Sequence, residues 1–220
     1  MGVPLLHPCM ARAITLDELT QGEAARALKA ALERGARSAI GQLGQLNGFL
    51  GNERVRIPLP RQLQDAEPML RTFGQGGRLD ELVTTMNRAA EAAVPMAQEL
   101  MLGAVRNMSV ADAKKILGGG ETSVTSFFVD KTRVPLGQKF LPIVTRSTEK
   151  VGLAAQYNHI ASKAADFGLL PRENASIERY VTGKALDGLY YVVGEEERKI
   201  RRDPAATGSA LLSKVFGALR

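Results

Sequence analysis

The longest amphipathic pattern in this 220-residue chain covers residues 79–108, and it constrains the fold more than any other segment. Apolar residues recur there every three or four positions, while charged residues such as Asp80 and Arg88 occupy the opposite side. An apolar stripe of this kind has to be buried against other elements, so the pattern predicts a long core helix. Pro95 falls on the polar side, where we expect it to bend the helix without ending it.

The rest of the chain predicts further helices, which glycine and proline separate. Helical periodicity begins at Leu16 and stops at Asn47-Gly48, and more helices are expected over residues 60–72, 110–117, 121–128, 140–151, 153–167, 177–202 and 209–219. Residues 55–60 alternate and contain two prolines, which indicates a short extended segment and not a central strand. We therefore expect an all-α fold, a single-domain multi-helix bundle of roughly eight helices over residues 14–220 with one short extended loop segment.

Two capping patterns support these helix starts. Ser109 precedes Asp112 by three positions, which is the spacing of a capping box. Residues 174–176 (Asn-Ala-Ser) stand before the last long helix. That helix should end at Asp203, because the residue before a proline, here Pro204, avoids helical geometry.

The formal net charge is +6, and a basic surface attracts anionic partners. The charges nevertheless alternate in sign, as over residues 195–202, which is typical of a solvated helix face. We therefore expect no nucleic-acid binding. No transmembrane segment is predicted either, because no stretch approaches the roughly 18 to 20 apolar residues that a membrane span requires.

Residues 1–13 form a separate segment without helical periodicity. Ala11-Arg12-Ala13 has the small-x-small pattern of a signal-peptidase site, although no basic region and no apolar region precede it. The segment is interpreted either as the remnant of a signal peptide or as a disordered tail. Cys9 is the single cysteine, so an internal disulfide is excluded, and His7-Pro8 before it do not suit a lipidation site.

No motif for catalysis or metal binding stands out. The two histidines, His7 and His159, lack partners at metal-ligand spacing, so we expect no metal site and no cofactor. Residues 118–120 are three glycines before a helix start, an arrangement that can offer backbone N–H groups to an anion. Glu121 stands where that anion would bind, so a glycine helix stop explains the run better.

One polar group lies on the predicted long helix. Asn87 projects from the edge of the apolar face, with Arg88 and Glu91 nearby, and the three are candidates for ligand or partner binding. The alternative is structural, because a polar side chain near a core normally satisfies a neighbouring backbone group.

A second polar group lies on the last long helix. Tyr180, Lys184, Asp187 and Tyr191 follow one another at spacings of four, three and four, so they form one stripe, in which Lys184 and Asp187 can pair. The stripe is a candidate binding surface for a ligand or partner, and the alternative is a seam between two helices.

Several stretches resemble one family. The run over residues 180–189, followed by Glu195-Glu196-Glu197, Ile200-Arg201 and Pro204, resembles the C-terminal signature of the bacterial domain of unknown function numbered 4197. Residues 48–50, 57–60, 86–91 and 116–119 are similar to it as well, so the resemblance extends from about residue 16 to 218. The chain departs where the family tends to show Ala-Ala-Thr and then Tyr-Phe, because Ser123-Val124-Thr125 and Phe127-Phe128 stand there.

The resemblance implies a helical protein that is usually made with a signal peptide and exported to the Gram-negative envelope. It supplies no activity. We therefore expect a non-enzymatic periplasmic protein that binds an apolar or anionic envelope component, such as a lipid, or a partner protein. The alternative is an enzyme of unknown reaction that uses Glu91 or Asp187 as an acid or base. The sequence predicts no oligomeric state.

Overall fold

The structure is a computed structural model that describes residues 21–203. Its α-helices are α1 (Gln21–Leu43), α2 (Arg61–Thr72), α3 (Gly76–Ala93), α4 (Ala97–Arg106), α5 (Val110–Leu117), α6 (Ser123–Thr148), α7 (Gly152–Asp166) and α8 (Ile177–Arg202), and two 3₁₀ turns are η2 (Val94–Met96) and η3 (Arg172–Asn174). No strand occurs between residues 21 and 203, so the all-α prediction is confirmed. Residues 1–13 and the predicted helix 209–219 lie outside the described residues.

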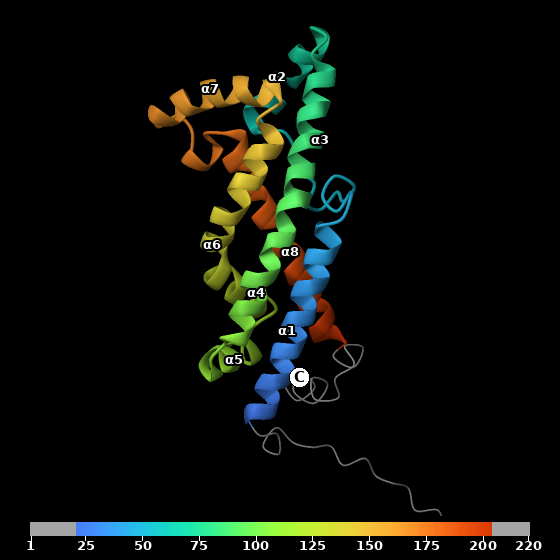
Figure 1. The fold of residues 1–220 in the computed structure, drawn as a ribbon, viewed down its shortest axis with the longest axis vertical. Coiled ribbons are helices and arrows are strands. Elements are labelled where there is room, and N and C mark those ends of the chain that lie inside the picture. The colour runs from blue at the N-terminus through green and yellow to red at the C-terminus, as the bar shows by residue number, and fades with distance from the viewer. Residues whose placement is uncertain (1–20, 204–220) are drawn as a thin grey trace, which may run out of the picture.

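The helices form an elongated bundle (Figure 1). The helices α3 and α4 run end to end along the long axis, α1 lies beside α4, and α6 lies on the other side. The helix α8 contacts α1, α3 and α6, and it buries Val181, Ala185, Leu189 and Val193 at regular intervals of four. The helix α7 projects crosswise at the end where α3 begins.

The predicted long helix over residues 79–108 is a nearly continuous rod. It begins as α3, passes through η2 and continues as α4. Pro95 is exposed, as predicted, and because it lacks an N–H the chain takes a 3₁₀ turn there in place of an α-helical one before α4 continues the rod. Counted with this rod as one element, the described part has 7 helices against the roughly eight expected from periodicity.

The prediction of separate helices over residues 121–128 and 140–151 is wrong, because α6 runs unbroken through Pro135 and Pro142. Its buried residues recur at intervals of four from one end to the other: Val124, Phe128, Thr132, Leu136, Phe140, Val144 and Thr148. A proline inside a helix costs about 3 kcal/mol. Both prolines lie off the buried stripe, so the packing of that stripe against α3 and α8 offsets their cost.

The capping predictions agree with the structure. The Oγ atom of Ser109 accepts from the backbone N of Asp112 at 3.1 Å, and an Asp112 carboxylate oxygen accepts from the backbone N of Ser109 at 3.0 Å. Ser176 accepts from the backbone N of Arg179 at 3.3 Å and begins α8. Each bond satisfies a backbone donor that the first helical turn leaves unpaired.

The loop between α1 and α2 is folded onto the bundle. Phe49 and Ile57 are fully or almost fully buried, although they belong to no regular element. Gly188 of α8 makes room for this loop, because a Cβ atom there would lie 2.7 Å from Cε1 of Phe49 and 3.3 Å from Cβ of Val55. The tight contact between α8 and the loop therefore requires a glycine.

We expect Gly188→Ala to lower the free energy of unfolding by about 1–3 kcal/mol, because the added methyl group overpacks the contact with Phe49. The matched control is Gly183→Ala in the same helix, where a Cβ atom would meet nothing within 4 Å. That control should raise the free energy of unfolding by up to about 1 kcal/mol through helix propensity. Urea unfolding followed by circular dichroism measures both, and stabilisation by both variants would contradict the packing argument.

Candidate functional site

Asn87 lies fully buried on α3 and holds the extended segment over residues 55–60. Its Oδ1 atom accepts from the backbone N of Ile57 at 2.8 Å, and its Nδ2 atom donates to the backbone O of Ile57 at 2.9 Å and to that of Val83 at 2.8 Å. The side-chain amide thus gives Ile57 the two bonds that a neighbouring strand would provide. This is the structural role that sequence reasoning weighed against binding.

Glu91 lies one turn further along α3 and is 5% exposed. One carboxylate oxygen accepts from the backbone N atoms of Phe49 and Leu50 at 3.0 and 3.1 Å, and the other accepts from Nη1 of Arg88 at 2.6 Å. Arg88 also donates to Oδ1 of Asn47 at 2.9 Å. The structure therefore brings Asn87, Arg88 and Glu91 together as one anchor for the loop, and both oxygens of Glu91 have partners within the chain.

The stripe on α8 is on the outer face of that helix. Tyr180 is half-buried and donates its hydroxyl to the backbone O of Pro58 at 3.1 Å, and burial raises the pKa of its phenol to about 12. Lys184 is exposed, with its Nζ atom 5.9 Å from the centre of the Tyr180 ring. Tyr191 is exposed too. The stripe is therefore mostly exposed and not a packed seam between two helices.

Asp187 pairs with a different partner from the predicted one. Its carboxylate accepts from Nη2 of Arg133 on α6 at 2.7 Å, in place of the expected pair with Lys184. Both members of the pair are about half exposed, so this interaction contributes little stability. Whether any of these α8 residues binds a ligand or partner stays a prediction.

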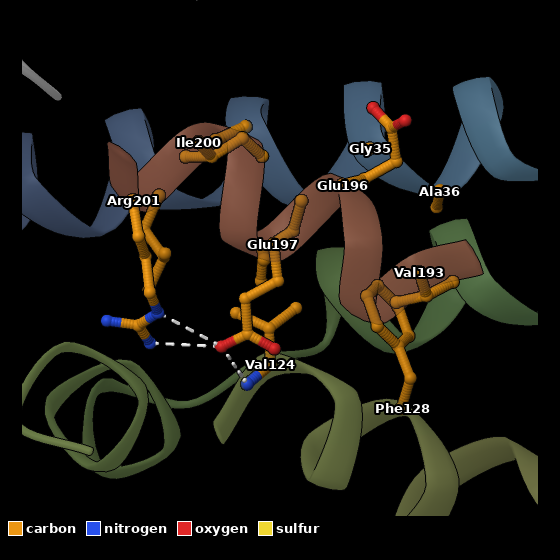
Figure 2. A pocket seen from close by; sticks show the side chains of 12 residues that line it. Gly35, Ala36, Val124, Phe128, Val193, Glu196, Glu197, Ile200 and Arg201 are labelled. Carbon is orange, nitrogen blue, oxygen red and sulfur yellow. Dashed lines mark hydrogen bonds and ion pairs between the residues drawn. The ribbon is translucent and has the colours of Figure 1, made fainter. Parts of the chain in front are cut away.

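Sequence reasoning missed a buried carboxylate on α8, that of Glu197, whose side chain is 1% exposed (Figure 2). It accepts from the backbone N atoms of Val124 and Thr125 at 3.0 Å each, from Oγ1 of Thr125 at 3.0 Å, and from Arg201 at 3.1 Å. A side chain of α8 thus caps the first turn of α6.

The interpretation of residues 195–202 as a solvated face is wrong for Glu197 and for Arg201, whose side chain is 15% exposed. The signal was present in the sequence. Glu197 follows Leu189 and Val193 at intervals of four, so it continues the apolar face of α8.

The arrangement around Glu197 also explains residues 118–120. Gly118 is the C-terminal cap of α5, so the run acts as a helix stop. The backbone N–H groups at the start of α6, which could have bound an external anion, donate to the Glu197 carboxylate. The anion for this helix terminus is supplied by the chain itself.

A small cavity lies beside Glu197 between α1, α6 and α8 (Figure 2). Its volume is about 20 Å³, room for about one water molecule, and its walls are mostly apolar, with Leu28, Phe128 and Val193 among them. The cavity is too small for an organic ligand. It shares Ala31 and Gly35 with an open groove of about 440 Å³ between α1 and α8.

Another exposed surface lies on α7 and on the turn that follows it, at the end of the bundle where α3 begins. Ile160, Phe167 and Leu169 are 70%, 81% and 78% exposed, and we call these three residues the α7 surface. The helix packs through the buried residues Leu153, Ala154, Tyr157 and Ala161, and the hydroxyl of Tyr157 donates to the backbone O of Asn174 at 2.9 Å. Ile160 lies only three positions from Tyr157 but is not covered by this packing.

Within residues 21–203, no three or more His, Cys, Asp or Glu side chains are grouped so that they could hold a metal ion. No helix in this range is long and apolar enough to cross a bilayer.

We expect Glu197→Gln to lower the free energy of unfolding by about 3–5 kcal/mol, because it removes the negative charge from a buried ion pair with Arg201 and from the start of α6. The control is Glu196→Gln, which removes a pair with Lys199, a side chain 65% exposed, and should cost less than about 1 kcal/mol. Thermal and urea unfolding measure both variants. Equal losses would show that the charge of Glu197 does not matter to the fold.

A comparison with family models gives one match, described as "Protein of unknown function (DUF4197)", over residues 18–217. No curated protein and no solved structure matches the chain.

Proposed function

The chain belongs to the DUF4197 family of proteins of unknown function, and we propose that it is a non-enzymatic periplasmic protein that binds a partner protein through the α7 surface. The observation that carries this proposal is the exposure of Ile160, Phe167 and Leu169, on and directly after a helix that stands crosswise to the bundle (Figure 1). Three large apolar side chains exposed within ten residues of the chain favour an interaction site.

The spacing of these side chains fits one mode of recognition. Ile160 and the partly exposed Ala164 lie one turn apart in α7, and Phe167, the residue that caps the helix, follows three positions later, so the three continue one face. A helix that enters an apolar groove of another protein presents its anchors at this spacing. The proposed partner therefore offers a hydrophobic groove.

The charges around α7 favour a protein over an anionic lipid surface. Lys163 and Arg172 are exposed, but so are Asp166 and Glu173, so the surroundings of the apolar side chains carry both signs. A mixed polar rim is common at protein interfaces. Attraction to anionic headgroups would instead require an excess of lysine and arginine.

Export is supported by the Ala11-Arg12-Ala13 pattern and by the family's usual signal peptide. We expect the protein purified from the envelope fraction of its own host to begin at Ile14 when its mass is measured under denaturing conditions. A mass that includes residues 1–13 would contradict the periplasmic assignment and leave the α7 proposal to be tested separately.

The enzyme alternative has weaker support. The carboxylate of Glu91 is enclosed by donors from Phe49, Leu50 and Arg88, an arrangement that suits an anchor and not a group that exchanges protons with a substrate. Asp187 stands half exposed in a surface ion pair with Arg133.

The test is site-specific photocrosslinking from position 163, between Ile160 and Phe167, in the full chain expressed in its host. We expect a discrete protein adduct that disappears in the double variant Ile160→Ser/Phe167→Ser. With the purified partner, the double variant should weaken binding roughly a hundredfold or more, because each large apolar side chain contributes about 1.5–3 kcal/mol when buried.

The matched control places the crosslinker at position 134 of α6, because Val134 is also 73% exposed but lies away from α7. The same adduct from both positions would show non-specific capture and overturn the proposal. A membrane would be the alternative partner. If the purified chain sediments with lipid vesicles, the double variant does not, and position 163 gives no protein adduct, then the α7 surface binds a membrane and the proposal of a protein partner is overturned.

A further inference from the structure

Residues 21–203 leave a groove between α1 and α8, and most of its surface is apolar. It is lined by Ala31, Arg34, Gly35, Glu196, Lys199, Ile200, Arg202 and Asp203, with a volume of about 440 Å³. Ala31 and Gly35 lie one turn apart on the same face of α1, and their small size creates the hollow. Ile200 forms the floor, and behind it lies the apolar cavity beside Glu197.

The groove lies where the described chain ends, so the residues that follow are candidates to occupy it. Asp203, the last described residue, itself lines the groove. Residues 204–208 come next, and five residues reach at most about 17 Å, which is enough to reverse the direction of the chain. Residues 209–219 follow directly, so they start within reach of the groove.

The sequence of residues 209–219 matches an apolar groove. Its large apolar residues are Leu211, Leu212, Val215, Phe216 and Leu219. Their spacing of one and three places them on one face of a helix, and a helix with such a face needs a surface to cover. The family match extends to residue 217, so most of this segment belongs to the matched domain and is not an appendage to it.

We propose that residues 209–219 dock as a helix into the groove between α1 and α8 of the same chain. The segment runs back along α8 and covers Ile200 with its apolar face. This contact lies at the opposite end of the bundle from the α7 surface and is independent of the proposed function.

The groove is tested with Gly35→Leu in the full chain. A Cβ atom at Gly35 would lie 3.6 Å from Cβ of Glu196 and 3.7 Å from Cδ1 of Ile200, which are ordinary contacts, and we expect the larger leucine side chain at this lining position to obstruct the groove. The control is Gly41→Leu, in the same helix, where a Cβ atom meets nothing within 4 Å. Both variants replace a helical glycine with leucine, so they share the gain in helix propensity.

Hydrogen exchange is the readout. We expect the amides of residues 209–219 to exchange at least about tenfold more slowly than in the free peptide in the wild type and in Gly41→Leu. In Gly35→Leu the protection should be lost. Exchange at the free-peptide rate in the wild type, or unchanged protection in Gly35→Leu, would overturn the proposal.

A photocrosslinker at position 216 identifies the surface that is covered. We expect links within one chain to peptides of α1 and α8, and few from position 213, which lies away from the apolar face. Links that form only between two chains would show that the segment docks on a second copy, and they would overturn the intramolecular contact.

Discussion

A carboxylate that leaves water costs several kcal/mol unless donors replace its hydration, and the donors for Glu197 come from α6 and from its own helix. The first turn of α6 supplies backbone N–H groups and a threonine hydroxyl, and α8 supplies Arg201. Arg201 in turn donates to the backbone O of Ile116 in α5 and to Oγ of Ser123. The ends of α5, α6 and α8 are therefore joined through the Glu197 carboxylate and Arg201. The start of α6 carries a partial positive charge, which stabilises the negative carboxylate placed against it.

Periodicity predicted most helices because their apolar stripes are long and regular. It failed at α6, where Pro135 and Pro142 suggested two stops. A proline ends a helix only when the cost of the lost hydrogen bond exceeds what burial of the flanking residues contributes. That balance depends on α3 and α8, which pack along the whole stripe, and the local sequence contains no information about them.

The residues of the anchor on α3 could be found from the sequence, but their partners could not. Asn87 and Glu91 are polar positions beside an apolar stripe, which marks them as unusual. The backbone atoms that they bind lie about 30 to 40 positions earlier in the chain, in a loop without periodicity. The sequence did not predict the exposure of the α7 surface, because Ile160 and Phe167 fit the pattern of core residues. Only the structure shows that nothing within residues 21–203 covers them.

The described chain begins at Gln21 and ends at Asp203 on the half of the bundle that lies opposite α7 (Figure 1). The rod of α3 and α4, which connects the two halves, is about 45 Å long at 1.5 Å per helical residue. The described fold is therefore polar, because Gln21 and Asp203 lie at one end of the bundle and α7 lies at the other. Whatever is joined to the fold through these two residues leaves it at the end remote from α7, so a partner could approach α7 without meeting the points where the chain enters and leaves.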